Sequence, residues 1–304
     1  MNTLLSVLIV TFNNEDDLPR CLDSLCQYLE VQRAEIVVVD NASTDRTAAI
    51  LREYREPCSA QGVRLRVVQN PANFGFTRAV NQGLQLSTGR FVLLLNPDTE
   101  VPPGSVRRLL QYLSNRPEVG AVAPQLRYPD GTVQPSCRRF PRYAYLLSEI
   151  FGLNRLFPRS RRFNAWKMGD FDHRSIRPVD QPQGACLMVK RSVLNEIGPL
   201  DERFFLFFSD VDLCKRIWDA GQSVHFYPQA KVLHRKGSAV YRDRARLIWQ
   251  SHQDFIRYFL KWYRRPTERL ANLFGIPFLA VLGIARTAVA WMRERVARNP
   301  SGAN

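Results

Sequence analysis

The sequence is poor in acidic residues for its size. Asp and Glu number 28 against 43 Lys and Arg in 304 residues, which gives a formal net charge of +15. Residues 138–162 carry +6 of this excess and residues 242–304 carry +8. Because the rest of the chain is nearly neutral, an anionic membrane surface or an anionic ligand is favoured as a partner. The Arg-rich stretch contains no nucleic-acid-binding motif, so no nucleic acid is expected.

Signals of export and of a disulfide or metal framework are also missing. The six cysteines, at positions 21, 26, 58, 137, 186 and 214, show no CxxC spacing. This predicts reduced, packed thiols in a cytosolic compartment. The N-terminus lacks a basic segment and a small-residue cleavage site, so residues 4–12 are expected to form a strand rather than a signal peptide. We therefore expect a globular, cytoplasmic protein.

Short β-branched apolar runs alternate with helical segments in the first hundred residues. Strands are predicted at 4–12, 34–43, 63–71 and 89–98, and helices at 16–28, 43–54 and 77–86. This alternation predicts an α/β fold with a mostly parallel sheet. Ligands of such sheets bind at the carboxyl ends of the strands. Because Asn13, Asp40, Asn73 and Asp98 all follow strand ends, one cleft is expected to gather them.

The second half of the chain is less regular. A helix is predicted at 105–113, a strand at 119–128, a hairpin turn at 128–133, a strand and helix within 184–198, and a strand at 223–234. Residues 138–178, rich in Arg and aromatic side chains, are expected to form a mobile or interfacial insertion. We expect one domain over residues 1–240 and a basic helical tail over 241–304.

The tail contains an apolar segment at residues 273–285. This uncharged run is shorter than the roughly 20 residues needed to span a bilayer, and it contains Pro277. It favours an amphipathic helix lying in the membrane interface. The alternative is a helix packed on the sheet.

Five segments in a fixed order carry a specific resemblance. They are SVLIVTFNN (6–14), EIVVVDNASTD (35–45), NFGFTRAVNQG (73–83), LLLNPDTEV (93–101), and the stretch from GACLMVKRSVLNEIG (184–198) through FFSDVDLCKR (207–216) to HRKGS (234–238). Their order and spacing resemble family 2 glycosyltransferases, above all the bacterial rhamnosyltransferase-like branch, over about residues 4–240. The resemblance implies the GT-A fold, in which helices flank a mostly parallel nucleotide-binding sheet. It also implies inverting, metal-dependent hexosyl transfer.

The resemblance implies a set of donor-binding residues. These are Thr11, Phe12, Asn13, Asp40, Asn73, Gly75, Arg78, Asn96 and Asp98. The Asp40 carboxylate can accept the imide N–H of uracil or thymine. The alternative role of Asp40 is a helix cap, although Ser43 and its neighbours are expected to supply that cap and leave Asp40 free. Phe12 is either a wall for the base or a core aromatic.

The expected metal site departs from the family pattern. The family usually has Asp-x-Asp where this chain has Asn96-Pro97-Asp98. Asp98 and His234 are the implied ligands of Mg²⁺ or Mn²⁺, and one carboxylate suffices when phosphates and water complete the shell. Residues 235–238 favour an anion-facing loop. The alternative is that Asn-Pro-Asp is only a turn.

The expected general base is Asp210. Family members usually carry Glu-Asp here, and Ser209 replaces the Glu. The apolar residues 204–208 precede Asp210, which predicts a desolvated carboxyl group with a raised pKa. Asp212 is the competing candidate, and a helix cap is the alternative role of Asp210. Gln183, Gly184 and Asp212 are expected on the acceptor side.

The resemblance favours transfer of L-rhamnose from dTDP-L-rhamnose, or another dTDP- or UDP-sugar donor, in cell-envelope glycan synthesis. The expected acceptor is a lipid-linked glycan or polysaccharide, and the expected location is peripheral, on the inner face of the cytoplasmic membrane. Because Asn96 and Ser209 replace acidic residues, an inactive membrane-associated scaffold with the same fold is the alternative. A nucleic-acid-binding protein has less support. The sequence carries no signal for the oligomeric state.

Overall fold

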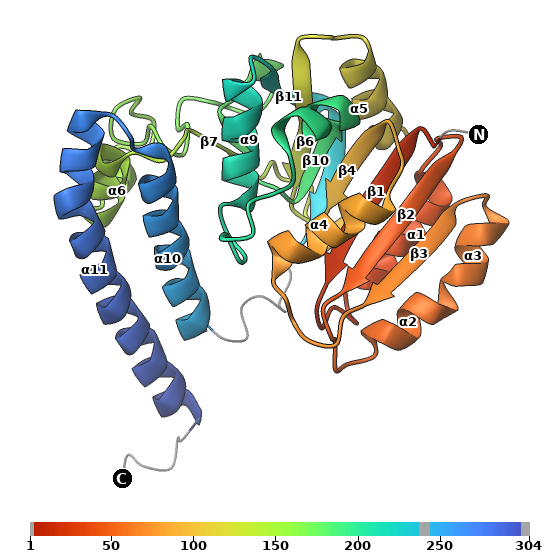
Figure 1. Ribbon diagram of the computed structural model, residues 1–304, viewed down its shortest axis with the longest axis horizontal. Coiled ribbons are helices and arrows are strands. Elements are labelled where there is room, and N and C mark those ends of the chain that lie inside the picture. Colours follow the sequence, from red (N-terminus) through yellow and green to blue (C-terminus); the bar gives the residue numbers. More distant parts are fainter. Residues whose placement is uncertain (1–2, 237–243, 299–304) are drawn as a thin grey trace. The chain divides into compact units, whose positions relative to one another are not determined.

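The structure is a computed structural model that describes residues 3–236 and 244–298 (Figure 1). The chain forms two compact units. The larger unit contains the described residues up to Leu200 together with 210–236, and the smaller contains 201–209 and 244–298. The expected boundary at residue 240 lies outside the described residues. The inclusion of Asp201–Ser209 in the smaller unit was not predicted.

The larger unit is built on a nine-stranded sheet, counted over the described residues (Figure 1). The strand order is β3-β2-β1-β4-β10-β6-β11-β5, and β8 pairs with β11. The strands are β1 (Leu5–Thr11), β2 (Ala34–Asp40), β3 (Arg64–Gln69), β4 (Phe91–Leu95), β5 (Thr99–Glu100), β6 (Val119–Arg127), β8 (Arg177–Pro178), β10 (Cys186–Lys190) and β11 (Ser223–His234). A separate two-stranded sheet joins β7 (Cys137–Arg138) and β9 (Gln181–Pro182).

The predicted parallel core of the sheet is confirmed. Strand β1 pairs in parallel with β2 and β4, and β2 pairs in parallel with β3. All seven residues of β2 are buried, as expected for a strand covered on both faces. The register sets Thr11 opposite Asp40. The carboxyl ends of these strands therefore lie at one edge of the sheet.

The larger unit contains nine helices over its described residues, and most of them supply apolar residues that pack against the sheet. They are α1 (Leu18–Tyr28), α2 (Thr47–Glu53), α3 (Arg55–Ala60), α4 (Phe76–Leu86), α5 (Ser105–Ser114), α6 (Tyr143–Ile150), α7 (Leu153–Leu156), α8 (Arg191–Ile197) and α9 (Ser209–Asp219). Alternate residues of β1 join two different core clusters, Val7 with Leu22 of α1 and Leu8 with Val80 of α4. The single helix expected at 43–54 is instead two helices, α2 and α3. Helices α6 and α7 lie in the insertion, where no periodicity predicted them.

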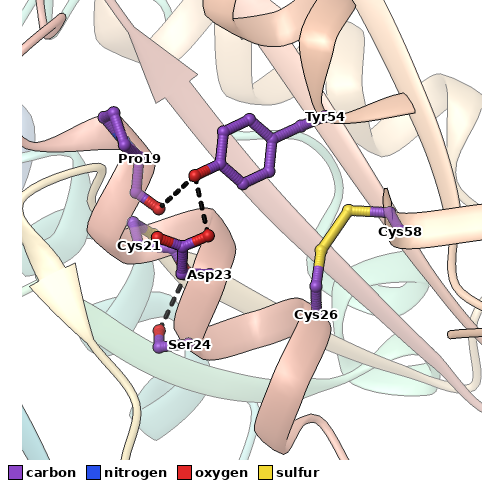
Figure 2. Close-up of a disulfide and its surroundings, with 7 residues drawn as sticks. All are labelled: Pro19, Cys21, Asp23, Ser24, Cys26, Tyr54 and Cys58. Atoms are coloured by element: carbon purple, nitrogen blue, oxygen red, sulfur yellow. Dashed lines mark hydrogen bonds between the residues drawn. A yellow bond between two sulfur atoms is a disulfide. The ribbon is translucent and has the colours of Figure 1, made fainter. Parts of the chain in front are cut away.

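A disulfide links α1 to α3 (Figure 2). It joins Cys26 to Cys58, and Tyr54 lies beside it with its hydroxyl donating to Asp23 at 2.7 Å. The expectation of six reduced cysteines is therefore wrong for this pair, although the other four are free and buried. The two cysteines are 32 residues apart, so their spacing in the sequence gave no sign that packing brings them together. Cysteine spacing consequently does not identify the compartment of this protein.

A buried imidazole fastens the insertion to the sheet. His173 is 2% exposed, and its ring packs against Phe226 of β11. Its Nδ1–H donates to the Phe171 carbonyl at 3.0 Å, and its Nε2 accepts the Cys137 backbone N–H at 3.1 Å. The Gln125 amide donates to the His173 carbonyl at 2.6 Å. Strand β7 is thus held in place by a neutral histidine.

The smaller unit pairs α10 (Arg244–Trp262) with α11 (Pro266–Arg298). A Cβ at Gly283 of α11 would lie 2.9 Å from the Cβ of His252 on α10, so glycine permits the close approach of the two helices. Asp254 of α10 is fully buried and accepts the backbone N–H of Phe207 at 3.1 Å. This bond and the packing of Phe208 on Phe255 explain why residues 201–209 belong to this unit.

Helix α11 is more continuous than the sequence predicted. It runs through Pro277 and is, by length and composition alone, able to cross a membrane. The expectation of an interfacial helix rested only on the uncharged residues 273–285, which are too few to span a bilayer. The whole helix is long enough, so its length does not decide between a spanning and an interfacial helix. Large apolar side chains on α11 remain exposed beside α10. They include Leu270, Leu273, Phe274, Phe278, Val281 and Ile284.

His173 makes the stability of the larger unit depend on pH. Burial lowers the pKa of His173 to about 4, against an ordinary value near 6.5. The neutral ring therefore stabilises the fold fully above about pH 6.5, and this contribution is lost as the pH falls toward 4. Its size is on the order of 3 kcal/mol. Urea unfolding of wild type and His173→Gln at about pH 7 and about pH 5 should show a smaller pH dependence in the variant. An equal pH dependence would contradict this role.

Candidate active site

The loops after β1 and β2 interlock at the carboxyl edge of the sheet. The Asn13 backbone N–H donates to Ser43 Oγ at 2.9 Å, and Asn13 Oδ1 accepts the Thr44 N–H at 2.8 Å. Asp40 is 2% exposed, and its Oδ1 accepts both the backbone N–H and the hydroxyl of Ser43. Asp40 is therefore not left free as expected, because its Oδ1 already organises the loop.

The segment before α4 reaches the same edge. The Asn41 side-chain amide donates to the Gly75 carbonyl at 3.0 Å. Gly75 has φ 86°, a conformation that favours glycine, and α4 begins at the next residue. Asn73 Oδ1 accepts the Gly75 N–H at 3.0 Å, and the Arg78 guanidinium is exposed with its carbon 4.3 Å from the Phe74 ring centre. The strand ends and this loop thus bring Thr11, Asn13, Asp40 and Gly75 together.

Phe12 is exposed at the end of β1. Its side chain is 40% exposed, while Thr11 before it is buried and donates its hydroxyl to Asn14 at 3.1 Å. The alternative of a core aromatic is therefore wrong for Phe12.

The Asn-Pro-Asp step lies between β4 and β5, and it faces the end of β11. The Asn96 backbone N–H donates to the Ala185 carbonyl at 2.9 Å, which ties the step to the residue before β10. Asp98 Oδ2 lies 3.3 Å from His234 Nε2, and the Asp98 carbonyl accepts the Arg235 N–H at 3.0 Å. Two residues that are 136 positions apart in the sequence are thereby joined. Residues 237 and 238 of the expected anion-facing loop lie outside the described residues.

Gln134 orients the His234 ring, a contact that no sequence pattern predicted. Gln134 is 1% exposed, and its Oε1 lies 2.7 Å from His234 Nδ1. The Gln134 amide nitrogen points at the His234 carbonyl at 3.5 Å, which assigns the oxygen to the ring. An amide oxygen only accepts, so Nδ1 carries a proton and Nε2 is the ring nitrogen that faces Asp98.

The carboxylate of Asp17 is a second feature that sequence reasoning missed. Burial first, and then the negative charge of Asp98, raise the pKa of Asp17 above its usual value. The described residues contain no group of three or more His, Cys, Asp or Glu side chains arranged to hold a metal. A cation at this edge would therefore take Asp98 and His234 as its protein ligands. A carboxylate and an imidazole fit a divalent ion whose other ligands are phosphate and water.

The candidate base Asp210 lies in the first turn of α9. Its Oδ2 accepts the Gly184 backbone N–H at 2.8 Å, and its Oδ1 accepts the Val211 N–H at 2.9 Å. Burial raises the pKa of Asp210, while these two hydrogen bonds oppose the rise. A Cβ at Gly184 would lie 2.9 Å from the Asp210 Cβ, so only glycine permits this approach. The expected raised pKa is therefore borne out in direction.

Asp212 occupies a different environment from Asp210. It is completely buried, and Arg216 Nε donates to its Oδ2 at 3.0 Å. A carboxylate held in a buried ion pair is poorly suited to contact a substrate. The geometry thus favours Asp210 over Asp212 as the base. Gln183, the other residue expected on the acceptor side, donates its N–H to the Ser136 carbonyl at 2.7 Å.

Solved structures share this fold. A mannosyltransferase from Pyrobaculum calidifontis, in complex with GDP-Man and Mn²⁺, has a TM-score of 0.60 and 19% identity, covering 99% of this chain and 82% of that one. A GalNAc-T7 structure with UDP, GalNAc and Mn²⁺ has a TM-score of 0.66 and 15% identity, covering 99% of this chain and 58% of that one. These likenesses show the GT-A fold alone.

Sequence relatives identify the family. This chain is 32% identical over 287 residues to the N-acetylglucosaminyl-diphospho-decaprenol L-rhamnosyltransferase of Mycobacterium tuberculosis, covering 88% of each chain. It is 24% identical to the hexosyltransferase Agl10 of low-salt glycan biosynthesis in Haloferax volcanii, over 84% of this chain and 74% of that one. The family description "Glycosyl transferase family 2" matches residues 6–197. With the motifs gathered at one sheet edge and a family match over more than half its length, this chain belongs to glycosyl transferase family 2.

Proposed function

We propose that this protein transfers L-rhamnose from dTDP-L-rhamnose to a lipid-linked, GlcNAc-bearing diphosphate acceptor in cell-envelope glycan synthesis. The observation that carries the proposal is the 32% identity to the mycobacterial rhamnosyltransferase over 88% of both chains. The acceptor named for that relative is a polyprenyl diphosphate carrying N-acetylglucosamine. Identity over 88% of both chains, and not only over residues 6–197, supports a shared acceptor class.

The nucleotide of the donor binds at the edge formed by β1, β2 and the loop before α4. Asp40 keeps one carboxylate oxygen for the imide N–H of thymine or uracil, because both hydrogen bonds from Ser43 go to Oδ1. The exposed ring of Phe12 lies next along the chain from Thr11 and forms a wall for the base. Arg78 offers a planar donor fork to the diphosphate or the sugar.

Asp98 and His234 would hold a divalent cation, Mg²⁺ or Mn²⁺, with the donor diphosphate. Their 3.3 Å separation brings one carboxylate oxygen and one imidazole nitrogen close enough to share one ion. When bound, the cation neutralises charge on the diphosphate leaving group. The residues of this chain contribute orientation: Gln134 fixes the ring of His234, and Arg235 pairs with Glu100 at 2.8 Å.

Asp210 is the general base of a single displacement. Its carboxylate accepts the proton of the acceptor hydroxyl while the oxygen forms a bond to the anomeric carbon. The bond from that carbon to the nucleoside diphosphate breaks on the opposite face, and its electron pair leaves with the diphosphate. One displacement inverts the anomeric configuration, so no carboxylate nucleophile is required. The N–H groups of Gly184 and Val211 keep the carboxylate oriented.

The helical unit binds the inner face of the cytoplasmic membrane. Exposed apolar side chains on α11 and the excess of Arg in residues 242–304 suit an anionic bilayer surface. This location would bring the enzyme to the head groups of a lipid-linked acceptor. Flotation with vesicles containing anionic lipid, compared with neutral vesicles, tests it.

Release of nucleoside diphosphate tests the proposed reaction. Purified protein is incubated with dTDP-, UDP- and GDP-sugars, a lipid-linked GlcNAc acceptor, and Mg²⁺, Mn²⁺ or chelator. We expect metal-dependent turnover of dTDP-L-rhamnose, and a fall in kcat of about 10²–10⁴-fold in Asp210→Asn, because the variant lacks the base. Asp219→Asn, at the far end of the same helix, is the control and should retain activity. Absence of turnover with every donor would favour the inactive scaffold.

Gly184→Ala tests the position of the base. The added methyl group meets Asp210 at 2.9–3.3 Å and must displace its carboxylate. We expect kcat to fall by about 10-fold or more while the dissociation constant of the donor changes little, because the donor edge is not altered. Gly83→Ala is the control, since its Cβ makes an ordinary 3.4 Å contact with Leu8. Similar kcat values for Gly184→Ala and Gly83→Ala would show that the close approach of Gly184 to Asp210 does not position the base.

Gln134→Leu tests the orientation of His234. The variant leaves the imidazole free to rotate and to change tautomer, so we expect Mn²⁺ affinity in the presence of dTDP to fall by about 10–100-fold. The measurement is Mn²⁺ titration by electron paramagnetic resonance. Gln125→Leu removes another buried amide of the sheet, one that bonds to His173, and controls for lost stability. Equal Mn²⁺ affinity in Gln134→Leu and wild type would rule out the role.

A further inference from the structure

Strand β7 is linked to the candidate base, Asp210, through hydrogen bonds made by the segment before β10. In the small sheet, Arg138 of β7 lies opposite Gln181 of β9. Beyond this pair, the Gln183 N–H donates to the carbonyl of Ser136 at 2.7 Å. The next residue, Gly184, donates its N–H to Asp210 Oδ2 at 2.8 Å. The backbone around Arg138 is therefore fixed relative to the base by a short series of hydrogen bonds.

The Arg138 guanidinium lacks a counter-ion in the described part of the chain. Its Nη1 donates to the carbonyls of Pro135 at 3.1 Å and Cys137 at 2.9 Å, both neutral groups. No described Asp or Glu oxygen lies within the 4.0 Å of an ion pair. The nearest acid that influences it is Glu149, whose carboxylate is already bonded to Lys167. The side chain is partly buried, and burial lowers the pKa of Arg138.

Neighbouring polar groups are also unsatisfied. Ser136 is 2% exposed, and among the described residues its hydroxyl meets only the Cys137 thiol, a weak partner, and no nitrogen or oxygen. The Nε of Arg139 is buried and likewise unpartnered over the same part of the chain. Along an extended strand side chains alternate, so Ser136 and Arg138 share one side while Cys137 enters the core. A hydroxyl and a cation thus lie on the side of β7 away from the core.

Unpaired buried donors of this kind are costly unless a ligand completes them. A partly desolvated cation without a counter-ion is unfavourable, and each unmade hydrogen bond of a buried donor adds to the cost. An anion with several acceptor oxygens would satisfy the Arg138 guanidinium and the Ser136 hydroxyl together. Arginine forks and hydroxyl donors are typical of phosphate recognition.

We propose that Arg138, with Ser136, binds the phosphate groups of a diphosphate-ester acceptor beside Asp210. The proposal rests on the proposed function only in identifying Asp210 as the base that faces the acceptor. It assigns to the insertion a defined role, that of an anion site distinct from the donor diphosphate site at Asp98 and His234. The acceptor hydroxyl is then positioned by its own diphosphate.

The test measures binding to the full-length protein in detergent. Farnesyl diphosphate is the probe, with farnesol and inorganic diphosphate as the two comparison ligands, and dTDP reports the donor site. In Arg138→Met we expect affinity for farnesyl diphosphate and for inorganic diphosphate to fall about 10-fold or more, because a charge-assisted contact is lost. Affinity for farnesol and for dTDP should change less than about twofold. Arg138→Lys should fall between the two, since it keeps the charge and loses the fork.

The control variant is Arg174→Met, an exposed arginine of the same insertion. It should bind farnesyl diphosphate like wild type. Unchanged affinity in Arg138→Met would overturn the proposal, and so would a loss confined to dTDP, which would assign the arginine to the donor. An equal loss for farnesol and farnesyl diphosphate would overturn it as well, because the contact would then not be with phosphate.

The outcome is separable from that of the proposed function. If Arg138→Met weakens diphosphate binding while no sugar is transferred from any donor, the anion site stands and the proposed reaction fails. If sugar is transferred and Arg138→Met leaves the KM of the lipid-linked acceptor unchanged, the anion site fails alone. Matching thermal unfolding of wild type and both Arg138 variants establishes that the fold is intact.

Discussion

Three consecutive backbone groups hold the candidate active site together. The N–H of Gln183 bonds to Ser136, the N–H of Gly184 bonds to Asp210, and the carbonyl of Ala185 accepts the N–H of Asn96. Each bond reaches a different part of the chain: the start of β7, the first turn of α9, and the step after β4. Since β10 follows at once and is paired on both sides, these residues have little freedom to move. The base and the acidic step are therefore held by the same short segment.

The candidate site has fewer acidic residues than its family usually has, and the contacts of Asn96 and Asp98 account for the difference. Asn96 uses its backbone N–H for Ala185 and its carbonyl for the Thr99 hydroxyl at 2.6 Å, so its first task is to shape the step. Asp98 then meets His234 at 3.3 Å, and under the proposed function the imidazole would provide the second ligand in place of the missing Asp. Asp17 lies close enough to Asp98 for the charge of Asp98 to help raise the pKa of Asp17. A site with one carboxylate ligand relies on the donor diphosphate to complete the coordination of a cation.

Sequence patterns predicted the parts of this molecule that depend on local periodicity. The buried strands β1, β2 and β4, and the polar residues that follow them, came from apolar runs and their ends. The disulfide and the membership of Asp201–Ser209 in the helical unit did not, because each depends on packing between segments far apart in the sequence. The two helices of the insertion were missed because their sequence shows no clear periodicity. Asp40 shows a subtler limit: its position was predicted, yet its bond to Ser43 depends on how the loop folds back. Gln134 was missed for the same reason, since 100 residues separate it from His234.

The stretch from Gln134 to Arg138 joins the two halves of the site. Gln134 fixes the ring that faces Asp98, and two residues later Ser136 bonds to the backbone next to Gly184. A displacement of this stretch would disturb the His234 ring and the surroundings of Asp210 together. His173 restrains this stretch because its Nε2 accepts the backbone N–H of Cys137. A structural histidine can thus influence both donor and acceptor binding through one backbone hydrogen bond, because the segment that it holds is short and extended.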